Sequence, residues 1–144
     1  ALEKALPDLS GAGAALAQLN QAGLALKAND VPKALAAFDS AIQDRGAPSL
    51  VRDLARVQKA SIMLDQKNMT AAQIDETLKP VLKEKNSAFY AQAILINAAA
   101  HFTLVKGDKN KAATALKELI ADPALPASVK ERASALLAVY EVQS

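Results

Sequence analysis

Apolar residues in this chain recur at helical spacing, and one pattern of them occurs twice. In each copy a small residue is followed by apolar residues four and seven positions later. The two copies are Ala34-Phe38-Ala41 and Ala112-Leu116-Leu119. They are 112 − 34 = 78 residues apart, or two units of about 39, and Ala71-Ala72 lies near the midpoint, where a middle copy is expected. This period is typical of helical hairpins that stack and share one core, so the pattern predicts an all-α fold.

Periodicity and turn residues together predict seven helical stretches. Five of them follow a residue that is suited to cap a helix, and the last starts either at Pro126 or in a capping box of Ser128 and Glu131. Pro80 is expected to kink or end the fourth stretch near Lys79, because proline removes a backbone hydrogen bond and clashes with the preceding turn. The predicted stretches are 12–28, 31–44 (capped by Asp30), 50–66 (Ser49), 71–79 (Thr70, with Gln73 in a capping box), 88–105 (Ser87), 109–121 (Asp108) and 126–142.

Short turns between these stretches predict antiparallel hairpins, because a connection of a few residues leaves neighbouring helices side by side. Residues 1–11 are expected to be a tail or the end of an upstream helix. These residues and the rest of the chain are expected to form one domain. The predicted divisions of this domain, 1–144, are hairpin 1 over 12–48, hairpin 2 over 49–86, hairpin 3 over 87–123 and a capping helix over 126–142.

Composition and charge narrow the classes of function. Alanine supplies much of the apolar content, which favours closely packed helices. The 17 basic and 15 acidic side chains give a net charge of +2, which is too balanced for a general polyanion binder, so no nucleic-acid partner is expected. The sequence contains no cysteine, which excludes disulfides and thiolate chemistry, and no cofactor is expected. No apolar run is long enough to span a membrane, and an anchor upstream of Ala1 is left open.

The second helix of each predicted pair resembles the second helix of a tetratricopeptide repeat. The segments that carry the resemblance are VPKALAAFDSAIQD and NKAATALKELIADPALP. Their small residue lets the paired helices approach, and the apolar residues one and two turns later fill the gap to the next helix. Gly107 and Asn29 each lie five residues before the small residue, where such repeats turn. The resemblance implies a right-handed α-α superhelix of about three hairpins plus a C-terminal capping helix.

Other marks of the tetratricopeptide repeat are missing, because the first helices lack the usual large aromatic residue and Gly-x-x-Tyr. A generic helical hairpin is therefore the alternative. Some tetratricopeptide domains grip a C-terminal carboxylate with a lysine and an asparagine four residues apart. Leu19 and Gly23 hold the matching places here, which argues against such a clamp.

The repeat alignment implies a peptide-binding groove lined by the first helices. Its candidate residues are mainly apolar or neutral polar, which suits an extended or helical peptide better than a charged one. The candidates are Leu16, Leu19, Leu26, Gln58, Ser61, Asp65, Asn97, His101 and Leu104. Asn97 and His101 lie one turn apart and are expected to share a helix face, where they would fix the register of a bound peptide. A buried or exposed structural role for His101 is the alternative.

Candidate catalytic and metal-binding groups are few. His101 is the only histidine of the sequence, and without cysteine or a second histidine a zinc site is not expected. Asp75 and Glu76 are adjacent, and neighbouring helical residues point about 100° apart, so both carboxylates are expected to be solvated rather than to form a catalytic pair. Without a nucleophile–base pair, the sequence predicts that the protein is not an enzyme.

Nearly the whole chain resembles a bacterial membrane-anchored family whose members are described as ancillary subunits of the Sec translocon (YfgM-like). In that family an N-terminal transmembrane helix holds a tetratricopeptide-like domain on the outer face of the inner membrane. The resemblance implies a periplasmic interaction scaffold whose partners are the translocon or periplasmic chaperones, with a cytoplasmic location as the alternative. A structural or self-assembling module that forms a homodimer is the second hypothesis. The segments that carry the resemblance are SLVRDLARVQKASIMLDQ, Leu78-Lys79-Pro80-Val81-Leu82 and GDKNKAATALKELIADPALPASVKERASALLAVY.

Overall fold

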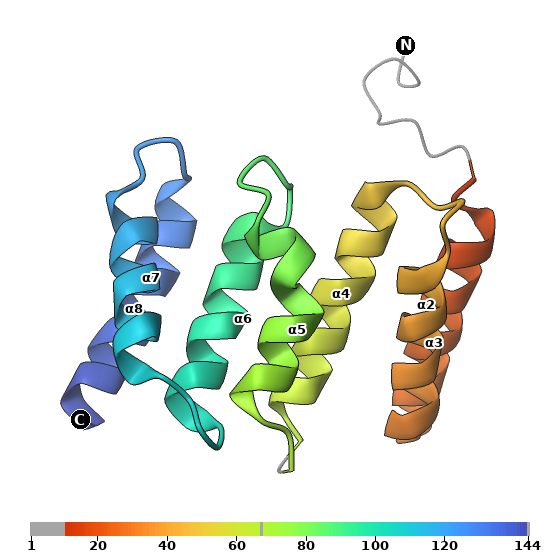
Figure 1. Cartoon of the computed structure of the whole chain (residues 1–144), viewed down its shortest axis with the longest axis horizontal. Helices are drawn as coiled ribbons and strands as arrows, with labels where there is room; N and C mark the ends of the chain where they lie inside the picture. Colours follow the sequence, from red (N-terminus) through yellow and green to blue (C-terminus); the bar gives the residue numbers. More distant parts are fainter. Residues whose placement is uncertain (1–10, 67, 144) are drawn as a thin grey trace. The chain divides into compact units, whose positions relative to one another are not determined.

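Helices account for all the regular structure in the residues that the computed structural model describes, 11–66 and 68–143 (Figure 1). The predicted all-α class is therefore confirmed for these ranges. Of the expected tail over 1–11, residues 1–10 lie outside the described residues. In the described ranges, no helix combines the length and apolar character that a membrane crossing requires. The helices are α2 (Gly13–Lys27), α3 (Val31–Gln43), α4 (Ser49–Leu64), α5 (Ala71–Leu82), α6 (Tyr90–Thr103), α7 (Lys109–Ala121) and α8 (Ala127–Gln143).

Contacts within the chain divide it into two compact units, and the boundary falls inside α4, between Lys59 and Ala60. In the first unit α2 packs against α3, and in the second unit α6 packs against α7. These two pairs are the predicted first and third hairpins. Within the second unit α6 also packs against α5, and α8 packs against α7 and α6. The interpretation of the chain as one domain stays a prediction.

Three helices begin at the capping residues that the sequence predicts. The side chains of Asp30, Thr70 and Asp108 each accept a hydrogen bond from the backbone N–H three residues later, at 3.2, 3.3 and 3.0 Å. Gln73 completes the predicted capping box, because its side chain accepts from the backbone N–H of Thr70 at 2.8 Å. These bonds satisfy backbone donors that the first turn of a helix leaves free, so they fix where α3, α5 and α7 start.

The other four helices start one or two residues from the predicted position. α2 begins at Gly13 rather than at Ala12, and Ser49 is the first residue of α4 rather than its cap. α8 begins at Ala127, one residue after the predicted start at Pro126, and the alternative cap Ser128 lies inside the helix. The hydroxyl of Ser87 accepts from the backbone N–H of Phe89 at 3.2 Å, in the turn before α6. A serine that bonds to the backbone two residues on stabilises a turn, which is why α6 starts later than expected, at Tyr90.

The end of α6 is set by a contact with another part of the chain. The helix was expected to reach Val105 but ends at Thr103, and Leu104 has extended backbone angles. The carbonyl of Val105 accepts from the N–H of Ala71 at 3.4 Å, and Thr70 and Val105 form an isolated parallel bridge. The start of α5 therefore holds the chain extended where local periodicity alone favours a longer helix.

The proline in α5 does not end that helix, so the predicted end near Lys79 is wrong and the predicted kink stays a prediction. The helix continues past Lys79 and Pro80 to Leu82. Proline removes the N–H that would bond to the carbonyl of Glu76, but Glu76 and Pro80 are both exposed. Water can bind the freed carbonyl on this side of the helix, so the lost hydrogen bond is tolerated.

The second helices of the three predicted hairpins share one register, counted from their caps. The caps lie 70 − 30 = 40 and 108 − 70 = 38 residues apart. Positions 4, 8 and 11 after each cap are at most 4% exposed in all three helices. The middle copy of the apolar pattern therefore starts at Ile74, not at Ala71-Ala72 as predicted. The nine residues are Ala34, Phe38 and Ala41, then Ile74, Leu78 and Val81, then Ala112, Leu116 and Leu119.

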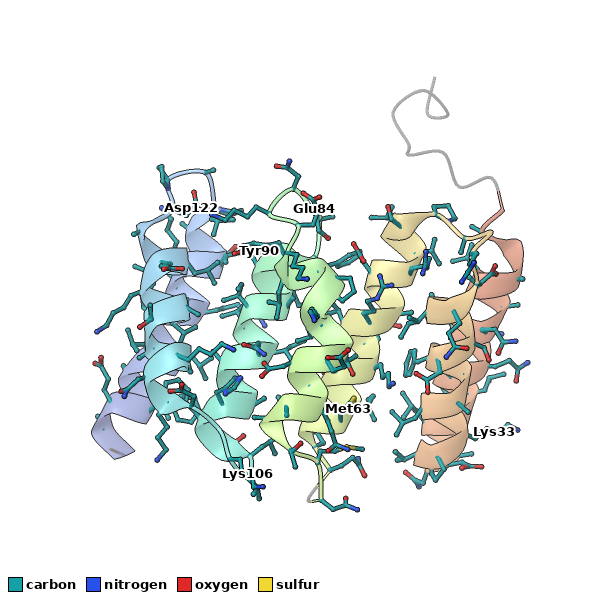
Figure 2. All side chains as sticks on the ribbon, in the orientation of Figure 1. Lys33, Met63, Glu84, Tyr90, Lys106 and Asp122 are labelled. Atoms are coloured by element: carbon teal, nitrogen blue, oxygen red, sulfur yellow. The ribbon has the colours of Figure 1, made fainter. Side chains whose placement is uncertain are left out.

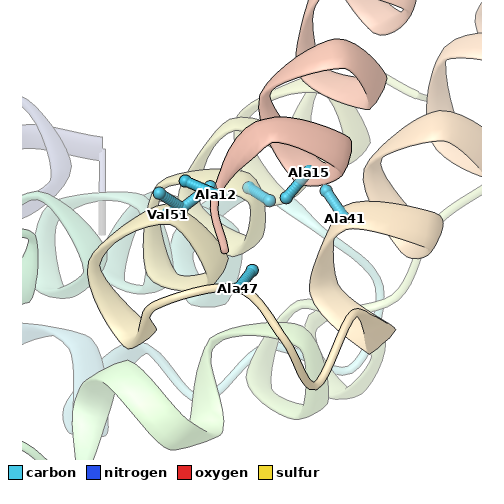
Figure 3. Packing of buried hydrophobic residues seen from close by; sticks show 6 residues of the cluster. Ala12, Ala15, Ala41, Ala47 and Val51 are labelled. Atoms are coloured by element: carbon cyan, nitrogen blue, oxygen red, sulfur yellow. The ribbon is translucent and has the colours of Figure 1, made fainter. Parts of the chain in front are cut away.

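Small side chains build the core of the first unit (Figure 3). The cluster joins α2, α3 and the first turns of α4, with Leu19 and Ile42 packed against it. Backbones approach closely here: a Cβ on Gly11, whose φ is +83°, would lie 2.2 Å from the carbonyl oxygen of Gly46. Such contacts explain the high alanine content, since only small side chains allow them. The buried members are Ala12, Ala15, Ala41, Ala47, Val51 and Ala55.

Larger side chains build the core of the second unit. Leu95, Leu116 and Leu119 form a cluster between α6 and α7, and Ala133 of α8 completes it. The rings of Phe102 and Tyr140 stack with centroids 3.9 Å apart, which attaches the end of α8 to α6. Burial raises the pKa of the Tyr140 phenol. The last helix is thus anchored by apolar contacts along its inner side.

Candidate functional site

A carboxylate on α5 joins three helices of the second unit. Asp75 accepts a hydrogen bond from the side-chain amide of Asn97 and another from His101 Nε2, which lies 2.8 Å from Oδ1 and 3.0 Å from Oδ2. Both donors belong to α6 and are buried, at 6% and 5% exposed. The ammonium group of Lys111 on α7 lies 4.0 Å from Oδ2. We call Asp75, Asn97 and His101 the Asp75 network.

A backbone N–H at the start of α7 selects the tautomer of the neutral His101 ring. The backbone N–H of Asp108 points at His101 Nδ1 from 2.9 Å. A peptide N–H can only donate, so Nδ1 accepts and carries no hydrogen. The hydrogen of the neutral ring therefore lies on Nε2, from which it is donated to Asp75. Both ring nitrogens are used within the protein.

A glycine lets the turn before α7 approach the histidine backbone. A Cβ on Gly107 would lie 2.1 Å from the carbonyl oxygen of His101, which no side chain tolerates. Lys106, with φ +60°, is the left-handed residue of this turn, and Asn29, with φ +59°, is that of the turn before α3. Both predicted turn positions are thus confirmed: Asn29 is the left-handed residue of its turn, and Gly107 closes the other turn by donating its N–H to the carbonyl of Leu104 at 3.2 Å.

The Asp75 network resembles the Asp–His part of a catalytic triad only in its pairing. In a triad the second ring nitrogen faces a nucleophile, whereas His101 receives a backbone N–H there. No group of three acidic, histidine or cysteine side chains suited to a metal occurs among the described residues. In the same part of the chain no buried side-chain nitrogen or oxygen lacks a hydrogen-bond partner. The network therefore holds α5, α6 and α7 together.

The predicted groove residues have different environments. Asn97 and His101 share a helix face, as predicted, and both side chains are buried and bonded to Asp75. Leu19 packs against the core cluster of the first unit, whereas Leu16 is 43% exposed. Whether these residues line a peptide groove stays a prediction. The others are exposed (Gln58, Ser61, Asp65) or partly buried (Leu26, Leu104).

Two open hollows lie over α6. The larger one lies between α5 and α7, and the smaller one is lined by α7 and by the loops that follow α5 and α7. The larger has a volume of about 500 Å³ and the smaller about 380 Å³. They meet at Ile94 and Ala115, which line both, and we call the joined hollows the α6 groove. Of the nine predicted groove residues, only Asn97 lines it.

Charged side chains line the groove on both walls. Lys79 of α5 and Lys83 just after it line the larger hollow, together with Lys111 of α7. Glu118 of α7 and Asp122 after it line the smaller hollow. Figure 2 shows Tyr90 and Asp122 at the same end of α6 and α7, where the smaller hollow lies. The groove thus combines an apolar junction with charged side chains around it, which is typical of binding sites.

Asp75 is predicted from the sequence to be solvated, and its contacts with α6 were not predicted. Its side chain is 32% exposed and bonded to two buried donors. A signal for this was present, because Asp75 lies on the face of α5 that carries Ala71 and Leu78, both fully buried. A carboxylate inside an apolar stripe needs a polar partner, and a histidine inside the alanine-rich α6 offers one.

Comparisons with known proteins concern the chain as a whole. No curated protein and no solved structure matches it. The family described as "Protein of unknown function (DUF2659)" has a sequence model that matches residues 1–140. Because this match spans nearly the entire chain, the protein belongs to the DUF2659 family.

Proposed function

We propose that this protein is a non-enzymatic scaffold that binds another protein at the α6 groove. The observation that carries the proposal is the groove itself, which is open, apolar at Ile94 and Ala115, and bordered by charged side chains. Grooves of this composition between packed helices are common binding sites for peptides and helices. The engagement of both nitrogens of His101 supports a role without catalysis.

The finer architecture belongs to the same proposal. The shared register of α3, α5 and α7 supports tetratricopeptide-like repeats of about 39 residues, which stack into a right-handed superhelix with α8 as its capping helix. In such an array each hairpin buries its apolar face only against its neighbours. The exposed surfaces between successive second helices are then available to partners.

The location and partners of the protein are proposed from the resemblance to the translocon-associated family alone. The protein would act on the periplasmic face of the bacterial inner membrane, anchored by a segment upstream of Ala1. Its partners would be the translocon or a periplasmic chaperone. Fractionation of cells that make the full-length protein tests this location, and recovery in the cytosolic fraction would contradict it.

Affinity capture from cells at native expression level tests the scaffold role. The variant Ala115→Arg places a long side chain at the junction of the two hollows, whereas Thr114→Arg places the same side chain on an exposed site of α7 that lines neither hollow. We expect a reproducible partner that the wild type and Thr114→Arg retain and Ala115→Arg loses. Equal retention by both variants would remove the groove from the proposal, and the absence of any partner would remove the scaffold role.

A homodimer is the second candidate function, and the outer side of α8 favours it. Val139 and Val142 are 52% and 86% exposed there, next to the exposed Ala135 and Ala138. This apolar stripe suits contact with a second copy. Sedimentation equilibrium over a range of concentrations tests the dimer: Val139→Lys should shift the molecule toward a monomer, and a wild type that is monomeric throughout rules this function out.

A further inference from the structure

The two walls of the α6 groove offer unpaired charges of opposite sign. Lys79 lies on α5, Lys83 is the first residue after this helix, and Lys85 follows in the next loop. Glu118 lies on the opposite wall, one turn before Asp122. Within the described ranges none of these five side chains forms an ion pair. Their charges are therefore free to attract complementary groups of a partner.

Other charged groups of the groove do not cancel this pattern. Asp75 is bonded to Asn97 and His101, and it lies 4.0 Å from the ammonium group of Lys111, which lines the larger hollow from the start of α7 and balances this carboxylate. Glu76 lies at the start of the α5 wall, three residues before Lys79, and leaves the later part of that wall basic. The contrast is thus between Lys79 and Lys83, which line the larger hollow, and Glu118 and Asp122, which line the smaller one.

The floor between the walls is apolar except at Asn97 and the phenol of Tyr90. Leu82, Ile94 and Ala115 are each partly buried and line the hollows from α5, α6 and α7. A partner that fills the groove must therefore present three kinds of side chain in three directions at once. An extended strand presents only two, because successive side chains alternate between opposite faces. A helix presents all three, with residues three and four apart aligned along each flank.

We infer that the α6 groove receives one amphipathic α-helix of a partner protein. Its acidic flank lies against Lys79 and Lys83, its apolar stripe lies on Ile94 and Ala115, and its basic flank lies against Glu118. This inference rests on the proposed scaffold function and specifies the partner that the groove recognises. It also differs from the neutral peptide expected for the groove of the first helices.

Three synthetic helical peptides of sixteen residues provide the probes. All share one leucine stripe, and their two flanks carry glutamate and lysine, glutamate only, or lysine only. Fluorescence anisotropy with the full chain measures each dissociation constant. We expect the mixed peptide to bind at least about tenfold more tightly than either single-charge peptide, because like charges facing one wall oppose binding. The double variant Lys79→Glu/Lys83→Glu makes both walls acidic and should instead prefer the lysine-only peptide.

The double variant Lys109→Glu/Lys117→Glu is the matched control. It changes the net charge by the same amount on α7, at residues that line neither hollow, and should keep the preference for the mixed peptide. Equal binding of the three peptides, no binding at all, or the same change of preference in both double variants would overturn the inference. If these peptides fail while Ala115→Arg still abolishes capture of the cellular partner, the scaffold role stands and only the helical partner is wrong.

Discussion

The imidazole of His101 is held between a carboxylate and the first turn of another helix. Its Nε2–H is donated to Asp75, and its Nδ1 accepts the N–H of Asp108. Asn97 donates to the same carboxylate. Buried donors that lose their acceptor cost about 1–3 kcal/mol each, so at the scale of single residues we regard this network as a contribution to stability.

Removing the carboxylate should therefore destabilise the protein. Asp75→Ala leaves the Nε2–H of His101 and the amide of Asn97 without their acceptor, and we expect the free energy of unfolding to fall by about 2–4 kcal/mol. Glu76→Ala removes the neighbouring exposed carboxylate and should change the free energy of unfolding by less than about 0.5 kcal/mol. Urea denaturation followed by circular dichroism measures both values, and equal values would contradict the role assigned to Asp75.

The tautomer of the histidine is a second prediction at this scale. Because the N–H of Asp108 occupies Nδ1, the neutral ring should carry its hydrogen on Nε2. Nitrogen-15 NMR of the imidazole distinguishes the two tautomers by the chemical shifts of the ring nitrogens. A ring with its hydrogen on Nδ1, or a rapid mixture of both forms, would show that the bond between Asp108 and His101 is not made.

The second helices of the hairpins share a register but differ in the size of one residue. Position 4 after the cap is alanine in α3 and α7 and isoleucine in α5. All three residues are buried, so the protein leaves more room around position 4 of α5 than around position 4 of α3 and α7. The second helices thus share one register, but the side chain that packs at position 4 differs in size between them.

Exchanging these residues tests that interpretation. Ile74→Ala should lower the free energy of unfolding by about 2–5 kcal/mol, because it leaves a cavity. Ala112→Ile should lower it by about 1–3 kcal/mol, because the site in α7 is filled. Thermal and urea unfolding of both variants provide the comparison. If Ala112→Ile is as stable as the wild type, the packing around α7 is not as close as we describe.

The proline in α5 gives another prediction for an element. Pro80→Ala restores an N–H that can bond to the carbonyl of Glu76, and the helix already continues to Leu82. We expect the free energy of unfolding to rise by about 1–2 kcal/mol, since the gain in the helix exceeds the entropy that proline removes from the unfolded chain. A loss of stability, seen in the same urea titration, would show that proline shapes α5 in a way that alanine cannot.

Local chemistry made part of this fold predictable from the sequence. The caps Asp30, Thr70 and Asp108 bind backbone groups three residues away, so a short segment contains all the information. The end of α6 depends on Ala71, and the role of His101 depends on Asp75, 26 residues earlier. Helical periodicity places Asp75 on the buried face of α5 but does not tell which distant residue it bonds to, so neither the Asp75 network nor the α6 groove was predicted.

At the scale of the whole molecule, the chain is an all-α member of the DUF2659 family that contains two compact units. The Asp75 network and the α6 groove both lie in the second unit, and Asn97 and Asp75 belong to both. The polar network thus positions the helices whose outer sides form the groove. We propose that a partner protein occupies this groove.

Hydrogen–deuterium exchange of the full chain, with and without the partner recovered by affinity capture, tests whether the partner occupies the α6 groove. Binding should slow exchange in segments 75–83, 90–97 and 111–122, which line the groove, and leave α2 unchanged. Ala115→Arg should abolish that protection, and Thr114→Arg should preserve it. Protection confined to the part of α2 that carries Leu16, Leu19 and Leu26, with none at the groove, would contradict the account.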